Sequence, residues 1–404
     1  MKRTVIKLVA VGLAGLILLG NVRLHRPGSD RTTGAQLEFL ARSLDEGGAE
    51  RMQRWFPEGY VFTWALYGLA SAQHARGMAQ NDPARAYHLG AAEEAVWAVR
   101  TDSARSTFDP DLSPPRGAFY SAWSLYVLAE YVRATGKDAV SADVLTMFRD
   151  ECDRFVLALE SSESPFLESY RSLIWPADTA VGIAALGIYD SAVGPRYGPT
   201  IEHWVTAARA RLDPRLGALS HSAAPGSGAP LGGARGGSLA LMSRVLIDAD
   251  SAFAAEQFSI LRERFVDYRL GLPGVREYAH GIEGVGDVDS GPVILGFAGP
   301  ATVVGAGAAR VHGDLRLAEI LLGVVEMVGV PIQGWRTRRY GGGMVPVGDA
   351  FVAWSRSSPI GLSEWPSILP RLWHLPVHLV SGLLLTLLAI RVKWALGRLQ
   401  PRNA

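Results

Sequence analysis

The chain has 404 residues, of which 48% are hydrophobic, and this is enough apolar content to bury a large core. Charged residues make up 20% and leave a net charge of only +1, so we expect no nucleic-acid-binding surface. The single cysteine, Cys152, excludes an intramolecular disulfide and a cysteine metal cluster, and we expect neither a metal nor a cofactor.

Both ends of the chain carry apolar runs. Residues 4–20 follow a basic start and lack a small-residue cleavage site, which favours an uncleaved anchor over a removed signal peptide. Residues 372–390 have about the ~20 residues that a membrane helix needs. Three of the four lysines lie at these segments, and basic flanks favour the cytoplasmic side. We therefore expect membrane segments at 1–26 and 361–404 that hold an extracytoplasmic domain, residues 27–360, on membrane lipid.

A short amphipathic helix is predicted at residues 35–44, and apolar and polar helices then alternate. The predicted apolar helices cover residues 60–72, 117–134, 177–189, 238–247, 290–311 and 347–355. The predicted polar helices cover residues 81–100, 141–159, 197–212, 251–268 and 315–328. The loops before the apolar helices recur with a period of about 59 residues.

Helix pairs that cannot bury their inner faces alone must stack or close into a ring. With six such pairs, the pattern predicts an all-α fold, an (α/α)6 toroid of six helical hairpins flanked by the two membrane helices. Residues 292–309 contain no charge and could instead form a third membrane span. In a closed ring, the loops that lead into the inner helices share one face and would gather distant residues there.

Three carboxylates in these loops are candidates for acid–base catalysis. Trp175-Pro-Ala-Asp178 brings Asp178 to the start of the third inner helix, where the helix dipole alone would also favour it. Glu277, Asp287 and Asp289 lie in the loop before the fifth inner helix. Asp289 would suit an N-cap, which leaves Asp287 as the better catalytic candidate there.

Polar and aromatic side chains from the other loops would complete the rim of a cleft. The candidate substrate contacts, besides Trp175 and Asp289, are Tyr60, Arg116, Tyr120, His221, Arg235, Tyr278, His280, Tyr340 and Asp349. Arginines that face a cleft would suit an anionic substrate such as a uronate, whereas outward-facing ones would be solvated loop residues. The sequence lacks the Gly-x-Ser-x-Gly and His-Glu-x-x-His motifs of common serine hydrolases and zinc peptidases.

Two short motifs carry a family resemblance. Trp175-Pro-Ala-Asp178 is one, and Asp213…Gly217-Ala-Leu219-Ser-His221 followed by Arg235-Gly236 is the other. They resemble the Trp-x-Asp start of an inner helix and the Asp…Gly-Leu-x-His hairpin with its Arg-Gly turn in unsaturated glucuronyl hydrolases, which are six-hairpin glycosidases. That resemblance implies that Asp178 donates a proton to the substrate and helps to activate water. Where those enzymes carry Trp-x-Arg-x-Asn-Gly-Trp, this chain has Ala234-Arg-Gly-Gly-Ser238.

The sequence therefore predicts a membrane-anchored, glycoside hydrolase-like enzyme that processes a glycan or a small molecule, with carboxylates as general acid and base. Two alternatives stay open. Linalool dehydratase/isomerase is also similar in its α/α barrel and membrane-linked setting, and that resemblance implies an apolar alcohol substrate and cysteines in the cleft. A toroid without catalytic activity would instead bind a cell-envelope partner.

Overall fold

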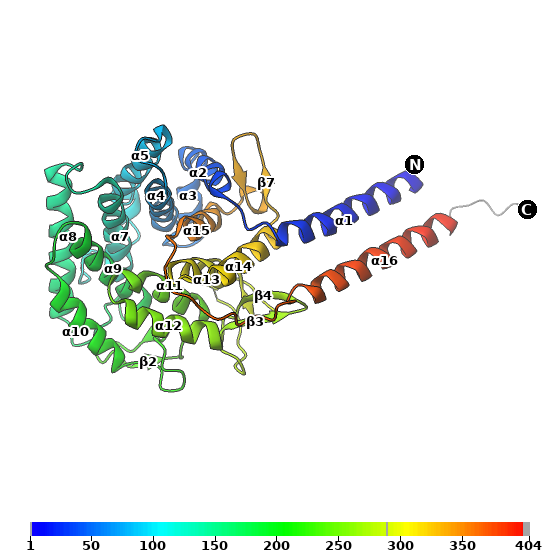
Figure 1. Cartoon of the computed structure of the whole chain (residues 1–404). Coiled ribbons are helices and arrows are strands. Elements are labelled where there is room, and N and C mark those ends of the chain that lie inside the picture. The colour runs from blue at the N-terminus through cyan, green and yellow to red at the C-terminus, as the bar shows by residue number, and fades with distance from the viewer. Residues whose placement is uncertain (1, 288–289, 399–404) are drawn as a thin grey trace, which may run out of the picture.

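The computed structural model describes residues 2–287 and 290–398, and its regular secondary structure is almost all helical (Figure 1). Six helices form a closed inner ring, in which each contacts the next and the last, α15, contacts the first, α4. The predicted toroid is therefore confirmed. The six inner helices are α4 (Gly59–Gly77), α7 (Gly117–Thr135), α9 (Pro176–Ala192), α11 (Gly236–Val245), α13 (Gly299–Val311) and α15 (Pro346–Ser357).

Six outer helices surround this ring, and the first of them, α2, packs on the last inner helix, α15. Side chains cap four of the six: Asp82, Ser141, Asp250 and Asp314 accept hydrogen bonds from the first-turn amides of α5, α8, α12 and α14. The short helices α3 (Gly48–Gln53) and α6 (Asp102–Arg105) lie in loops. The outer helices are α2 (Asp30–Asp45), α5 (Pro83–Ala98), α8 (Ala142–Glu160), α10 (Gly198–Arg209), α12 (Ser251–Arg264) and α14 (Leu315–Val328).

Small residues in the inner helices allow close packing. A Cβ atom at Gly182 of α9 would lie 2.1 Å from the ring of Phe155, and one at Gly187 would lie 2.0 Å from the carbonyl oxygen of Asp248. Neither position can accept a side chain without movement of its neighbour. The high glycine and alanine content of these helices is thus a packing requirement of the ring.

Four two-stranded antiparallel hairpins interrupt the helical pattern. They are β1 (Ser222–Ala223) with β2 (Pro230–Leu231), β3 (Val266–Arg269) with β4 (Leu272–Val275), β5 (Val293–Ile294) with β6 (Phe297–Ala298), and β7 (Ile332–Gln333) with β8 (Arg338–Arg339). Single 3-10 turns cover Leu246–Asp248 and Gly341–Gly343.

Two predicted helices were too long. The polar helix predicted to reach residue 268 ends at Arg264, where β3 follows. The apolar helix predicted from residue 290 begins only at Gly299, because Gly291 and Gly296 adopt positive φ angles of 62° and 86° that a helix cannot accommodate. The alternative of a third membrane span at 292–309 is also wrong, since α13 is a short inner helix that contacts α11, α14 and α15.

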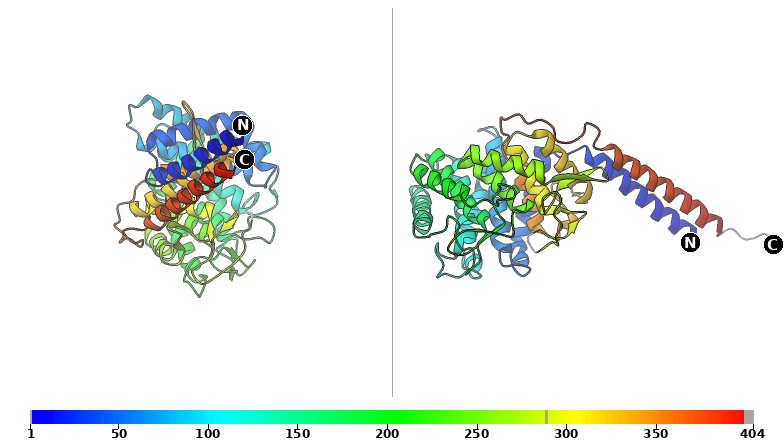
Figure 2. Two further views of the ribbon diagram at one scale, coloured as in Figure 1. Left: turned by 90° about the vertical axis from the view of Figure 1, so that its right-hand side faces the viewer. Right: turned by 90° about the horizontal axis from the view of Figure 1, so that it is seen from below.

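The two terminal helices, α1 (Lys2–Leu24) and α16 (Leu375–Arg398), project from the toroid side by side (Figure 2). Both are long and apolar enough to cross a membrane, and only 6% and 11% of their apolar windows are buried, so they are not core helices. The Asn21 amide donates to the Ser381 hydroxyl at 2.8 Å and joins the two. Because α1 runs towards the toroid and α16 runs away from it, both termini lie at the same far end (Figure 1).

Aromatic side chains fill the ring between α4, α7 and α15. The Phe62 ring lies 4.8 Å from that of Phe119, 4.9 Å from that of Trp123 and 5.5 Å from that of Phe351, measured between centroids. Trp123 in turn lies 5.9 Å from Trp354. Edge-to-face contacts of this kind stabilise aromatic pairs beyond their area of burial. These rings therefore form one aromatic cluster near the starts of α4 and α7, in which Phe62 and Phe351 remain partly exposed.

Candidate functional site

The loops that lead into the inner helices form one face of the ring, which we call the mouth. Backbone hydrogen bonds join neighbouring loops: the Ala118 amide donates to Glu168 O at 2.7 Å, and the Ala223 amide donates to Ile174 O at 3.1 Å. The Gly236 amide, the first of α11, donates to Glu277 O at 2.8 Å. Within the described residues no inner helix has a side-chain N-cap bond, and the Glu168 and Glu277 carbonyls instead satisfy one first-turn amide of α7 and one of α11.

Several predicted site residues meet where α11 and α13 begin. Arg235, which precedes α11, forms an ion pair with Asp287 and lies 3.8 Å from the carboxylate of Glu277. Both contacts use the same guanidinium nitrogen, Nη1. The Arg235 guanidinium also lies 5.5 Å from the centre of the Tyr278 ring. We call this group, together with His221 and Ser238, the Arg235 cluster.

The two carboxylates of the Arg235 cluster differ in environment. Glu277 is buried, and its side chain lies beside the first turn of α11. A Cβ atom placed on Gly237 of that turn would be 3.8 Å from Glu277 Oε2. Asp287 is 39% exposed. Burial opposes ionisation of Asp287, but hydrogen bonds from the Ser290 amide and from Arg235 outweigh this effect and lower its pKa. One carboxylate is thus held in the protein and the other faces solvent.

His221 contributes a neutral imidazole to the Arg235 cluster. Its Nδ1 lies 2.6 Å from the Ser238 hydroxyl. Burial, reinforced by the positive charge of Arg235, lowers the pKa of His221 to about 4. At neutral pH the ring therefore carries no charge and can accept or donate a hydrogen bond according to its tautomer.

Asp178 lies in the first turn of α9, as predicted, and it is buried. The Ser169 hydroxyl donates to Asp178 Oδ2 at 2.6 Å, and the next residue, Thr179, accepts the Leu167 amide at 2.9 Å. These two bonds tie the loop before α9 to its first turn. One oxygen of Asp178 therefore holds the loop in place, while the Ile174–Ala223 bridge sets this loop beside the His221 hairpin.

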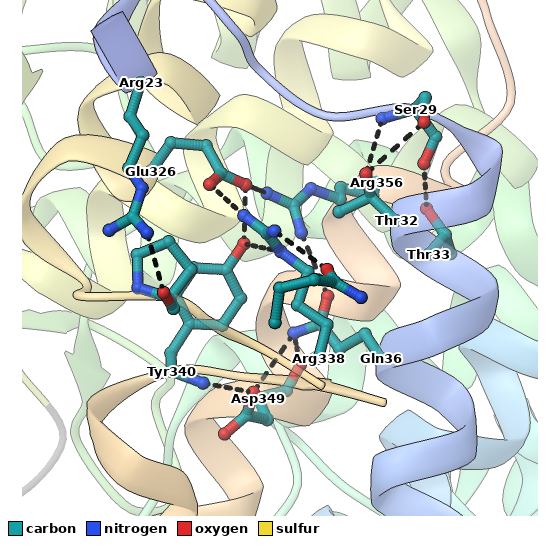
Figure 3. Close-up of polar contacts among 12 residues, drawn as sticks. Arg23, Ser29, Thr32, Thr33, Gln36, Glu326, Arg338, Tyr340, Asp349 and Arg356 are labelled. Atoms are coloured by element: carbon teal, nitrogen blue, oxygen red, sulfur yellow. Dashed lines mark hydrogen bonds and ion pairs between the residues drawn. The ribbon is translucent and has the colours of Figure 1, made fainter. Parts of the chain in front are cut away.

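A second polar group joins α2, α14 and α15 (Figure 3). Glu326 of α14 forms ion pairs with Arg338 and Arg356 and accepts the Tyr340 hydroxyl at 2.7 Å. Gln36 donates to Asp349 O at 2.8 Å and accepts from Arg356 at 3.1 Å. We call Gln36, Glu326, Arg338, Tyr340, Asp349 and Arg356 the Asp349 cluster.

The carboxyl group of Asp349 itself is buried in the first turn of α15. Its Oδ1 accepts the Tyr340 amide at 2.9 Å, and its Oδ2 has no hydrogen-bond partner among the described residues. Burial raises its pKa to about 7, although the bonds from Tyr340 and Gln36 act in the opposite direction. Tyr340 and Asp349, which were predicted separately as substrate contacts, are therefore in contact with each other but lie inside the protein.

The remaining predicted residues lie apart from these clusters. Tyr60 is buried in the first turn of α4. Arg116 and Tyr120 line a separate cavity at the start of α7. Trp175 packs edge-on against Tyr170 at 5.9 Å, and His280 is exposed. Asp289 lies outside the described residues, and the N-cap of α13 is Ala298.

Sequence reasoning missed the central members of the Asp349 cluster. Glu326 is buried although it stands in the apolar run 320–328, and Arg356 is buried near the end of another apolar helix. Both residues are lone charges within apolar helices. Such a charge predicts a buried ion pair, because an unpaired charge is costly inside a protein.

The described residues contain no group of three or more His, Cys, Asp or Glu side chains that could hold a metal ion. Comparison with known proteins found no matching family model and no matching curated protein.

Proposed function

We propose that this chain is a membrane-anchored enzyme that cleaves a glycan bearing a carboxylated sugar, with the Arg235 cluster as its reacting site. The observation that carries this proposal is the pair of carboxylates, Glu277 and Asp287, which share one guanidinium nitrogen of Arg235 at the mouth. Glycoside cleavage generally needs two carboxylates in different environments, and this pair supplies one buried and one exposed group.

Each residue then has a role that its contacts support. Arg235 is suited to bind the substrate carboxylate, because a planar guanidinium recognises carboxylates in two-point contacts and Asp287 can yield its place to a ligand. Once displaced from Arg235, Asp287 is free to act as the second carboxylate, with the buried Glu277 as its partner in acid–base catalysis. The neutral His221 is placed to bond to a sugar hydroxyl. Tyr278 offers an aromatic face beside Arg235.

Asp178 is the second candidate for proton transfer. The resemblance to unsaturated glucuronyl hydrolases supports it, and the bridge between Ile174 and Ala223 sets its loop beside that of His221. Its bond to Ser169 supports a structural role instead. The substitution Asp178→Asn separates the two roles, because the asparagine side chain would keep an acceptor for Ser169 but could not transfer a proton.

The alternative of a dehydratase acting on an apolar alcohol has less support. Cys152 is buried in the outer helix α8, and burial raises the pKa of its thiol well above the usual range. The thiolate that such chemistry implies is therefore disfavoured.

The test is turnover by the purified full-length protein in detergent on a panel of uronate-containing oligosaccharides, with products identified by mass spectrometry. We expect cleavage by the wild type, loss of at least a hundredfold in Glu277→Gln, in the range typical of an acid–base group, and normal activity in Glu283→Gln. Glu283 is a matched control because it lies in the same loop and is 88% exposed. Wild-type activity that survives Glu277→Gln would overturn the assignment, and a wild type inert on every member would favour a binding toroid.

We also propose that the toroid lies outside the cytoplasm, with both termini inside. The basic flanks at residues 2, 7 and 393 support this orientation. Because Cys152 is buried, a single introduced cysteine reports topology without interference. In intact cells a membrane-impermeant maleimide should label Leu362→Cys, at a 98% exposed position, but should not label Lys393→Cys. The reverse pattern would place the toroid in the cytoplasm.

A further inference from the structure

A cavity of about 250 Å³ lies between the first half of α7 and the middle of α8, beside the residues that follow α5 and the loop that leads into α7. We call it the α7–α8 pocket. Four arginines line it, Arg100, Arg105, Arg116 and Arg154, whereas Glu151 is its one carboxylate. None of the residues of the Arg235 cluster lines this pocket, so it is a separate site.

The charges in the α7–α8 pocket do not balance. Arg100 is neutralised, because its Nε and Nη2 donate to the two oxygens of Glu151 at 3.0 and 2.6 Å. Among the described residues, the Arg105 side chain donates only to the neutral hydroxyl of Tyr120, at 3.1 Å. Within the described part of the chain, Arg105, Arg116 and Arg154 form no ion pair with a carboxylate. Three like charges therefore surround one small cavity, and an anion between them would relieve their repulsion.

Ser124 supplies an independent indication of a ligand. It is only 4% exposed and lines the same pocket, and its hydroxyl has no hydrogen-bond partner among the described residues. Its carbonyl oxygen is already occupied by Arg100 at 3.0 Å. Buried hydroxyl groups in native proteins are nearly always bonded, so a bound ligand oxygen is the natural partner.

The backbone presents Arg116 to the pocket at some conformational cost. Arg116 has a φ angle of 70°, in the left-handed region that residues with a Cβ rarely adopt. The following Gly117 packs so closely on Ser169 O that a Cβ atom would come within 2.2 Å, which holds the turn in place. Strained residues of this kind concentrate at binding sites.

We propose that the α7–α8 pocket binds an oxyanion, the phosphate, sulfate or carboxylate group of a small molecule, through Arg105, Arg116, Arg154 and the Ser124 hydroxyl. Arginine is the side chain best suited to such groups, because its planar fork donates two parallel hydrogen bonds to an oxyanion. The volume accommodates the anionic group with a few further atoms. This proposal does not depend on the proposed function of the Arg235 cluster.

The test is calorimetric titration of the full-length protein in detergent with inorganic phosphate, sulfate and glucuronate, each at constant ionic strength. We expect saturable binding of at least one probe at a site that persists in Arg235→Gln, and the preferred probe at that site identifies the anionic group. Binding should weaken about tenfold in Arg154→Gln, the loss of one charge-assisted hydrogen bond, and also weaken in Ser124→Ala. Arg154 is exposed, so its variant should fold normally.

Arg149→Gln is the matched control, because Arg149 is an exposed arginine of the same helix that pairs with Asp150 and does not line the pocket. Binding in this variant should equal that of the wild type. The proposal is overturned if none of the three probes binds saturably, or if Arg154→Gln and Arg116→Gln bind as well as the wild type.

Discussion

The Arg235 cluster and the Asp349 cluster use the same kinds of side chain in opposite surroundings. Each combines arginine with glutamate, aspartate and tyrosine near the start of an inner helix. In the Asp349 cluster the Arg356 and Glu326 side chains are 3% and 2% exposed, and two arginines hold one carboxylate. In the Arg235 cluster one arginine is shared by two carboxylates, of which Asp287 is 39% exposed.

This difference separates a structural network from a candidate site. The charges of the Asp349 cluster are enclosed, and they join α2, α14 and α15 at the point where α1 meets the toroid, since Arg23 donates to Pro331 O at 3.0 Å and Gly28 packs on the Arg356 guanidinium. A ligand could not replace one of these buried ion-pair partners without separating α2, α14 and α15. In the Arg235 cluster, a ligand can displace the exposed Asp287 while Glu277 stays in place.

The largest effect on stability is expected for Glu326→Gln. This change removes the carboxylate that pairs with both Arg338 and Arg356, so it leaves buried positive charge without compensation. The free energy of unfolding should fall by about 3–5 kcal/mol. Denaturant titration in detergent, followed by circular dichroism, measures the change. A loss below about 1 kcal/mol would show that the Asp349 cluster does not hold α2, α14 and α15 together.

Asp349→Asn should change the pH dependence of stability. The folded chain holds a proton on Asp349 up to about pH 7, whereas the unfolded chain releases it near 3.8, so wild-type stability falls as pH rises between these values. The full difference is about 4 kcal/mol. The asparagine variant lacks this decline and should be more stable than the wild type above pH 7. An unchanged profile would mean that Asp349 is solvated.

His221→Asn should act with the opposite sign. The pKa of His221 is about 4 in the folded chain and 6.5 when unfolded, so the wild type loses stability as pH falls through this window. The loss amounts to about 3 kcal/mol and should be absent in the variant. Asp349 thus lowers the free energy of unfolding as pH rises, whereas His221 lowers it as pH falls. Parallel slopes for Asp349→Asn and His221→Asn would contradict this comparison.

Asp287→Asn is expected to have the smallest effect on stability, about 1 kcal/mol or less, because partly exposed ion pairs contribute little. The affinity for a uronate should rise instead, since the variant no longer competes for Arg235 with a negative charge. Titration with glucuronate monitors this change, and Glu256→Gln, in the partly exposed pair of Glu256 with Arg209, is the control. Weaker binding in Asp287→Asn would indicate that Asp287 contacts the ligand directly.

Much of the fold followed from the alternation of apolar and polar helices. The predicted starts at residues 117 and 315 are those of α7 and α14, and the ring closes as the period requires. The fifth unit deviated, because the loop before α13 forms two hairpins whose positive-φ glycines were not recognised as turns. Hydropathy alone does not distinguish a buried apolar helix from an apolar hairpin that precedes one.

The candidate site was predictable in part. The regular spacing of the inner helices placed Arg235, Glu277 and Asp287 in loops at the mouth of the ring, and the structure brings them into contact. The spacing of the predicted helices could not show that Tyr340 and Asp349 turn inward, because their partners Glu326 and Gln36 lie on outer helices, and Gln36 is 313 residues from Asp349 in the sequence. It also could not show that Arg116 and Tyr120 belong to a separate cavity between α7 and α8.

The most direct test of this account is to measure turnover and unfolding free energy together in Glu277→Gln and Glu326→Gln. We expect Glu277→Gln to lose turnover while its unfolding free energy stays within about 1 kcal/mol of the wild type. Glu326→Gln should show the reverse, with a large loss of stability and normal turnover in the fraction that remains folded. Full turnover in Glu277→Gln would contradict the account.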